Sequence, residues 1–245
     1  MVFSSCTDIS ASDILLQVFC GRESAENSVE FGRARWNPEG VAVNVKICGI
    51  TNLSDAIIGV EAGADALGFI FYPKSPRYIS FENAARIIRE LPAGILKVGV
   101  FVNASREDVL AAQQECQLSV LQFHGDEIPE FCAGFTGQTW KAFRVNGREI
   151  LNHLAAYRTT AWLLDAWSPA MPGGTGERFD WDLAVEAQKA GQPIILAGGL
   201  TPENVKSAVQ RVRPMGVDVS SGVEVAPGKK DSAKVRAFVS AAKQG

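Results

Sequence analysis

From Val45 onward, short apolar runs alternate with stretches in which apolar residues recur at helical spacing. Glycine, proline, serine or aspartate separates most runs from the stretch that follows. Eight runs are predicted strands: 45–47, 66–71, 96–102, 120–123, 140–145, 161–164, 193–197 and 216–219. Eight stretches are predicted helices: 53–62, 81–91, 106–116, 127–133, 148–156, 181–189, 202–211 and 232–242. Residues suited to capping begin several of them: Thr51 or Asn52, Ser80, Ser105, and Thr201 with Pro202 at the first helical position.

Strict alternation of strand and helix predicts parallel strands joined by right-handed crossovers. Eight units predict a single (β/α)8 TIM barrel over residues 45–245, with an open doubly wound sheet as the alternative. About 25 residues per unit make a compact barrel, at the low end of the usual ~200 to 400 residues. Because barrel enzymes build their sites from the loops that follow the strands, the candidate residues are those that end each predicted strand.

Charge divides the chain near residue 44. The protein has 245 residues, with 24 Lys and Arg, 27 Asp and Glu, and a formal net charge of -3. Residues 1–44 hold six acids and three bases, which account for the whole net charge, so residues 45–245 are balanced. We therefore expect an acidic N-terminal extension, residues 1–44, that is poorly ordered or reflects a start site assigned too far upstream. It is expected to contribute nothing to catalysis.

Composition excludes several classes of protein. Hydrophobic residues make up 47% of the chain and charged residues 21%, which allows a sizeable core. There is no basic run of the kind that binds nucleic acid, and no apolar run reaches the ~20 residues that cross a bilayer. The acidic first residues are unlike a targeting peptide. The five cysteines contain no C-x-x-C pair, so neither a disulfide framework nor a zinc site is indicated. We expect a cytoplasmic protein without metal, nucleic-acid or membrane binding.

Three predicted strands end in groups suited to proton transfer. Cys48 and Asp165 each follow a buried strand, and His124 is a competing acid or base. Lys46 shares strand parity with Cys48, about 6.6 Å away, where its ammonium would favour the reactive thiolate. Asp218 is the natural partner for Lys46, because the eighth strand is next to the first in a closed barrel. The plainer interpretations are that Cys48 is a small core side chain and that Asp165 caps a loop.

Glycines after the seventh and eighth strands predict a phosphate site. Gly198 and Gly199 follow the seventh strand, and Ser221 and Gly222 follow the eighth. Each pair alone is typical of an ordinary turn. Together, in the two loops where barrels often bind phosphate through backbone amides, they favour phosphate. Arg77 lies in a loop stiffened by two prolines, and its planar guanidinium pairs well with a carboxylate.

With these residues in place, residues 45 to about 239 resemble phosphoribosylanthranilate isomerase, a (β/α)8 enzyme of tryptophan biosynthesis. The long glycine-rich loop 172–176 suits either a lid or an oxygen-rich ligand that the bare backbone approaches, and its residues 173–176 belong to the match. The other matching segments are Lys46-Ile47-Cys48-Gly49, Ser75-Pro76-Arg77, residues 121–125, Leu164-Asp165, Phe179-Asp180-Trp181, Leu196-Ala197-Gly198-Gly199-Leu200, and residues 218–224. Their joint order and spacing make the resemblance specific, and only residues 1–44 fall outside it.

The resemblance implies an Amadori rearrangement of N-(5-phosphoribosyl)anthranilate to 1-(2-carboxyphenylamino)-1-deoxyribulose 5-phosphate, with no metal or cofactor. It implies that Cys48 is the general base and Asp165 the general acid, and that Arg77 binds the anthranilate carboxylate. The phosphate would bind at Gly198, Gly199, Ser221 and Gly222. A thiolate beside a neutral carboxylic acid requires that the surroundings lower the pKa of Cys48 and that Asp165 keeps its proton. Monomer and homodimer both stay open.

Two other functions are weighed against this one. Another phosphate-handling barrel, such as ribulose-phosphate epimerase or indole-glycerol-phosphate synthase, is the first. The epimerase is expected to present metal-binding His and acids at several strand ends, whereas this chain has only two His. The synthase is expected to bring Lys and Glu pairs, which the predicted strand ends lack. The second is a ligand-sensing or scaffold barrel, in which Cys48 and Asp165 would be dispensable.

Overall fold

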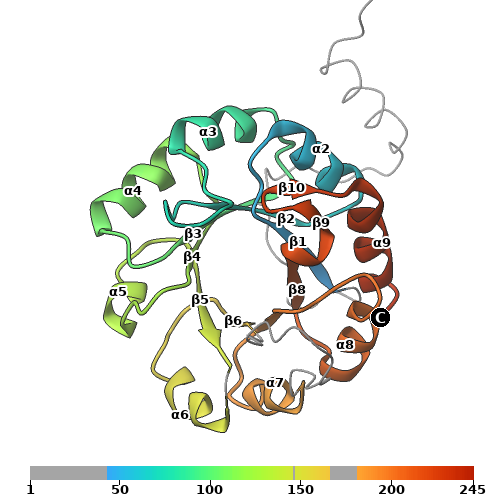
Figure 1. The fold of residues 1–245 in the computed structure, drawn as a ribbon. Coiled ribbons are helices and arrows are strands. Elements are labelled where there is room, and N and C mark those ends of the chain that lie inside the picture. The colour runs from blue at the N-terminus through green and yellow to red at the C-terminus, as the bar shows by residue number, and fades with distance from the viewer. Residues whose placement is uncertain (1–42, 146, 166–180) are drawn as a thin grey trace, which may run out of the picture. The chain divides into compact units, whose positions relative to one another are not determined.

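Eight parallel strands close into a barrel in chain order, with β8 hydrogen-bonded to β1 (Figure 1). The structure is a computed structural model that describes residues 43–145, 147–165 and 181–245, all within the compact unit Ala34–Gly245. The strands are β1 (Asn44–Cys48), β2 (Ala66–Ile70), β3 (Leu96–Phe101), β4 (Val120–Phe123), β5 (Gln138–Arg144), β6 (Ala161–Asp165), β7 (Ile194–Ala197) and β8 (Gly216–Val219). The predicted barrel is confirmed, and the open sheet is excluded because the first and last strands pair.

Helices surround the strands on the outside of the ring (Figure 1). They are α2 (Leu53–Glu61), α3 (Phe81–Arg89), α4 (Arg106–Glu115), α5 (Pro129–Ala133), α6 (Leu151–Leu154), α7 (Trp181–Gln188), α8 (Val205–Val212) and α9 (Ser232–Ala242). Ser80 and Ser105 cap α3 and α4 as predicted, each accepting a hydrogen bond from a backbone amide three residues on. At α2 the cap is Asn52, whose side chain accepts from the amide of Asp55.

Two predicted helices differ from the observed ones by more than two residues at an end. The helix predicted to begin at Pro202 begins at Val205, because residues 202–204 form a turn. The side chain of Asn204 closes that turn by accepting a hydrogen bond from the amide of Thr201 at 2.8 Å, so the predicted Thr201 cap is wrong. The predicted helix 148–156 is reduced to a 3-10 turn, η1 (Arg148–Ile150), followed by α6. It ends early because the amides after α6 bond three residues back, as in a 3-10 helix.

Apolar side chains fill both faces of the barrel wall. The larger cluster lies between the strands and the helices and includes Leu67, Phe123 and Phe238. A smaller cluster fills the barrel interior: Ala66, Leu96, Val98, Val120, Trp140, Ala142, Ala161, Leu163, Ile195 and Ala197. The barrel is therefore a packed core rather than a pore, and room for a ligand lies at its ends.

A short hairpin follows β8 and was not predicted. After a 3-10 turn, η2 (Ser221–Val223), the antiparallel strands β9 (Glu224–Ala226) and β10 (Lys229–Lys230) lead into α9. The hairpin packs on the end of β1, since Thr51 Oγ1 donates to the carbonyl of Gly228 at 2.6 Å. It thus lies at the carboxyl end of the barrel strands. Within the described segments, no helix is both long enough and apolar enough to cross a membrane.

Candidate active site

The carboxyl ends of the strands surround a cavity of about 220 Å³. Nine of the ten predicted site residues line this cavity, and the tenth, Lys46, lies beneath it. The nine are Cys48, Arg77, His124, Asp165, Gly198, Gly199, Asp218, Ser221 and Gly222. The predicted lid, residues 172–176, lies outside the described residues. Residues from six different strands, or from the loops that follow them, are therefore gathered at one place.

Lys46 and Cys48 point into the barrel from alternate positions of β1. The register pairs Lys46 with Asp218 on β8, and Lys46 Nζ donates a hydrogen bond to Asp218 Oδ1 at 2.9 Å. Lys46 is fully buried. Gly68 on β2 faces both side chains: a Cβ at Gly68 would lie 2.8 Å from Cys48 Sγ and 2.9 Å from Lys46 Nζ. The ammonium, the carboxylate and the thiol thus form one buried group.

Burial and charge act in opposite directions on the Cys48 thiol. Burial raises the pKa of Cys48, whereas Lys46 lowers it by its charge and by a hydrogen bond. Asp218 raises it again, and the net pKa is raised. The expected lowering is therefore not found, because the desolvation of a nearly buried thiolate exceeds the attraction of Lys46. For Lys46 itself, burial lowers the pKa, but the charges of Asp218 and Cys48 outweigh burial and keep the ammonium protonated.

Asp165 lies at the end of β6 in a chain of polar side chains. Its Oδ2 is 3.1 Å from His124 Nε2, and Nδ1 of the same imidazole is 3.1 Å from Gln122 Nε2. With the amide as donor to Nδ1, the imidazole carries its proton on Nε2 and donates to Asp165. The structure therefore places His124 as a partner of Asp165, where the sequence left it as a competitor. His124 and Asp165 are each about one-quarter exposed, toward the cavity.

The two glycine-containing loops meet on one wall of the cavity. Gly198 and Gly199 both have positive φ, 80° and 64°, a conformation that favours glycine. Gly222 lies against the carbonyl oxygen of Leu200 with no room for a side chain. The two loops are therefore in direct contact, and their exposed backbone amides can face a single anion.

Arg77 is held by a carboxylate that the sequence analysis did not assign. Glu224 accepts two hydrogen bonds from Arg77 Nε, at 2.9 and 3.1 Å, and one from Nη2 at 2.6 Å. These bonds raise the pKa of Arg77. Lys230, whose side chain is fully buried, donates to the same carboxylate at 2.8 Å. Burial raises the pKa of Glu224, but the bonds from Arg77 and Lys230 outweigh burial, so the net pKa is lowered.

Four residues near the cavity were given no role by the sequence analysis. Glu224 and Lys230 lie on the unpredicted hairpin, so no strand end pointed to them. Gln122 shares strand parity with His124 and could have been found from it. Gly68 is the register partner of Cys48, which only strand pairing reveals. Strand parity therefore predicts which residues of one strand share a face, but it does not predict which residues of two strands lie side by side.

Two buried polar atoms on the cavity wall have no hydrogen-bond partner among the described residues. They are Gln122 Oε1 and Ser220 Oγ. A buried polar atom without a partner is costly, and each of these could bind a polar group of a substrate. The described segments contain no group of three or more His, Cys, Asp or Glu suited to a metal ion.

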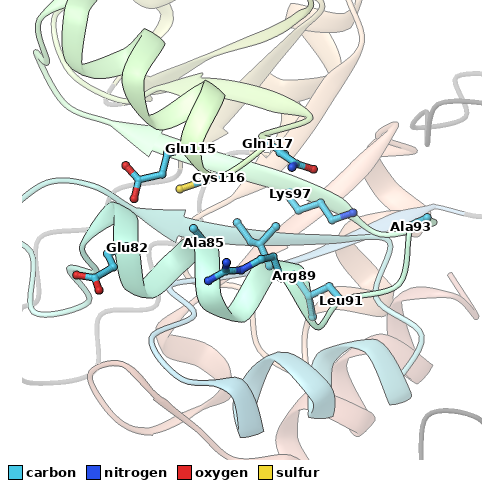
Figure 2. Close-up of a pocket in the computed structure, with 10 residues that line it drawn as sticks. Glu82, Ala85, Arg89, Leu91, Ala93, Lys97, Glu115, Cys116 and Gln117 are labelled. Atoms are coloured by element: carbon cyan, nitrogen blue, oxygen red, sulfur yellow. The ribbon is translucent and has the colours of Figure 1, made fainter. Parts of the chain in front are cut away.

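A larger cavity, about 530 Å³, lies outside the barrel between α3 and α4 (Figure 2). It contains none of the predicted site residues. Its Cys116 thiol donates to the carbonyl of Phe81 at 3.4 Å, and burial raises the pKa of Cys116 to about 11. At Cys116 the charge of Glu115 adds to the effect of burial, whereas at Cys48 the charge of Lys46 opposes it. The central cavity is therefore the candidate active site.

A closed barrel that brings a thiol, a carboxyl–imidazole pair and two glycine-containing loops to the carboxyl ends of its strands belongs to the class of (β/α)8 enzymes. Residues 45–241 match the family model described as "N-(5'phosphoribosyl)anthranilate (PRA) isomerase". The chain belongs to this family and is an isomerase, as the resemblance predicted.

Individual relatives agree with the family model. A protein of Citrifermentans bemidjiense named N-(5'-phosphoribosyl)anthranilate isomerase is 58% identical over 200 residues, which are 82% of this chain and 97% of that protein. The crystal structure of phosphoribosyl anthranilate isomerase from Thermotoga maritima is 48% identical, with a TM-score of 0.77, over 82% of this chain and 98% of its own. A structure of the isomerase in complex with reduced 1-(o-carboxyphenylamino)-1-deoxyribulose 5-phosphate is 46% identical, with a TM-score of 0.75 over the same shares.

Proposed function

We propose that Cys48 and Asp165 carry out the Amadori rearrangement of N-(5-phosphoribosyl)anthranilate by general acid–base catalysis. The observation that carries this assignment is their position in one cavity. Cys48 lies above the buried Lys46–Asp218 pair, and Asp165 lies against His124. No other cysteine of the described segments lines this cavity.

The glycine-containing loops are proposed to bind the phosphate end of the substrate. Gly198 and Gly199 on one side, and Ser221 and Gly222 on the other, line the cavity with backbone amides and one exposed serine. Phosphate needs several donors, and glycine lets the backbone approach closely. The unpartnered Ser220 Oγ, on the same wall, could add a hydroxyl bond.

Arg77 is proposed to bind the anthranilate carboxylate, which is the other charged end of the substrate. Because Glu224 takes the Nε–Nη2 edge of the guanidinium, a substrate carboxylate would meet the opposite edge, Nη1–Nη2. An arginine held in this way loses little conformational entropy when a carboxylate binds. The preorganised orientation supports a binding role.

The chemistry begins at the furanose ring. Asp165 donates its proton to the ring oxygen, the bond from that oxygen to C1 breaks, and the lone pair of the anilino nitrogen forms the C=N bond of a protonated Schiff base. The Cys48 thiolate then takes the proton from C2. The electron pair of that C–H bond forms a C1=C2 double bond, and the C=N electrons return to nitrogen. The resulting enolamine becomes the ketone when its C2 hydroxyl loses a proton and C1 gains one.

The reaction starts with a proton on the Asp165 carboxyl group and none on the Cys48 sulfur. Burial favours the thiol form of Cys48 before substrate binds. Moving that proton from sulfur to the Asp165 carboxylate gives thiolate and carboxylic acid with no net uptake of protons. The positive charge that develops on the Schiff-base nitrogen then stabilises the thiolate. Lys46 supplies a permanent positive charge with the same effect.

The test is turnover of substrate generated in the assay, followed by the loss of anthranilate fluorescence. Cys48→Ala and Asp165→Asn should each lower kcat by about 10²- to 10⁴-fold while thermal unfolding changes little. Cys116→Ala, a buried cysteine outside the barrel interior, is the matched control and should keep near-normal kcat. Near-normal turnover in either catalytic variant would refute the role given to that residue.

The setting proposed for the enzyme is the cytoplasm. Cys48, Cys116 and Cys132 are free thiols, which suits a reducing compartment. The proposed partner is the small phosphosugar–anthranilate substrate, with neither nucleic acid nor membrane required. The proposed oligomeric state is a monomer or a homodimer. The molecular mass measured by sedimentation at micromolar concentration would decide between them.

A further inference from the structure

Lys230 is a buried cation that the reaction as described does not use. Its side chain is fully buried. Its ammonium donates to the carbonyl oxygen of Cys48 at 2.5 Å, to that of Ser220 at 3.4 Å, and to Glu224 Oε1 at 2.8 Å. One ammonium therefore ties the backbone of the general base to the backbone that precedes Ser221 and Gly222.

The backbone around Lys230 is fixed as well. Its amide donates to Asp55 Oδ2 at 2.8 Å, and the amide of Gly228 donates to Glu224 Oε1 at 3.2 Å. Asp55 belongs to α2, so the hairpin is anchored to the first helix of the barrel. The ammonium is thus held from a rigid support rather than from a loose loop.

Glu224 connects Lys230 to Arg77. The same carboxylate accepts Lys230 and the Nε–Nη2 edge of Arg77. Arg77, Glu224 and Lys230 form one ion cluster, and Lys230 connects it to the backbone of Cys48 and of Ser220, which precedes the proposed phosphate-binding residues. Displacement of Lys230 would disturb the ion cluster and both of these backbone segments.

The charges around Cys48 support this arrangement. Four charged groups face Cys48: Lys46 on β1, Asp218 on β8, Arg77 after β2 and Lys230 on β10. A fifth, Glu224, lies between Arg77 and Lys230. Asp165 and His124 line the same cavity. The first five groups hold three positive and two negative charges, and a Cys48 thiolate would balance them. Burial dominates the pKa of Cys48 and raises it, while Lys46 and Lys230 both lower it.

We propose that Lys230 is a positioning residue of this isomerase, which orients Cys48, the phosphate loop and, through Glu224, Arg77. The inference rests on the proposed roles of these three groups. It requires the charge of Lys230 as well as its volume, since a carboxylate and two carbonyl oxygens converge on one ammonium.

The experiment compares Lys230→Met and Lys230→Gln with Lys229→Met in the full chain. Lys229 is the exposed neighbour on the same hairpin and is the matched control. Glutamine lacks the charge of lysine but can still donate hydrogen bonds to the carbonyl oxygens. The Lys230→Gln variant therefore tests the need for the charge even if Lys230→Met does not fold. Steady-state turnover gives kcat and KM, and alkylation of the Cys48 peptide by iodoacetamide across pH gives the midpoint of thiol ionisation.

Both Lys230 variants should lower kcat at least tenfold, raise KM, and move the Cys48 midpoint upward by about one pH unit, because a nearby positive charge is lost. Lys229→Met should change neither. An unmoved or lowered midpoint, or kcat within twofold of the parent, overturns the proposal, because a loss of packing alone would expose the thiol and so lower its midpoint rather than raise it. If the parent protein itself lacked turnover, the proposed function would fail, while the shift of the Cys48 midpoint would still report on Lys230.

Discussion

Replacing Gly68 by alanine tests whether the geometry around Cys48 controls the reaction. Gly68 lies on β2, opposite Cys48 in the register, where its missing side chain leaves room for two catalytic-site atoms. A new Cβ would lie 2.8 Å from Cys48 Sγ and 2.9 Å from Lys46 Nζ, whereas ordinary contacts begin at 3.4 Å. The sulfur must therefore move by roughly 0.6 Å and the ammonium by about as much.

This movement has two consequences of different size. Overpacking of a filled interior costs about 1–3 kcal/mol of the free energy of unfolding, which lowers Tm by about 3–10 °C in a domain of this length. A displacement approaching 1 Å at a reacting group costs about 10²-fold in rate. Because folded domains hold about 5–15 kcal/mol, Gly68→Ala should stay folded at 25 °C while kcat falls by one to two orders of magnitude.

The assay combines urea unfolding with turnover measured by anthranilate fluorescence at 25 °C. Gly94→Ala is the matched control, because nothing lies within 4 Å of a Cβ placed there. Its stability should change by less than about 0.5 kcal/mol, with kcat unchanged. A Gly68→Ala protein that turns over substrate at the parent rate would refute the reasoning, since Cys48 would then tolerate displacement.

Three further outcomes are expected. Lys46→Met should destabilise the fold by about 3–5 kcal/mol in urea unfolding, because Asp218 would stay buried without its cation; a loss below about 1 kcal/mol would show that the pair is dispensable. Labelling of Cys48 by iodoacetamide should rise about tenfold per unit from about pH 7 to about pH 9, because burial raises the pKa of Cys48; a plateau below pH 8 would contradict this. Deletion of residues 1–40 should leave kcat and KM unchanged, and a large loss of activity would show that this segment supports the barrel.

The local pattern of the chain was sufficient for the architecture. Alternating short apolar runs and helical periods predicted eight strands, and all eight are present with ends shifted by no more than two residues. Ser80 and Ser105 marked helix starts correctly because a cap acts within three residues of its own position. Thr201 failed because residues 202–204 form a turn, so that α8 begins only at Val205. The residue types do not specify where such a turn gives way to a helix.

Strand ends also located most of the site. A barrel brings the carboxyl ends of all its strands to one face, so residues such as Cys48, Asp165 and Gly198 could be assigned to one cavity without knowing a distance. Strand parity placed Lys46 and Cys48 on the same side of β1, and barrel closure placed Asp218 beside Lys46.

Only the tertiary structure decided how burial and neighbouring charges combine at each ionisable side chain of the site. The sequence indicated that Lys46 would lower the pKa of Cys48, but not that burial would exceed its effect. It assigned Arg77 to a substrate carboxylate but did not show that Glu224, 147 residues away in the chain, already pairs with it and is itself held by Lys230. Residue types and their periods determine which groups arrive at the barrel mouth. Desolvation and ion pairing depend on atoms distant in sequence, and only the folded chain brings these together.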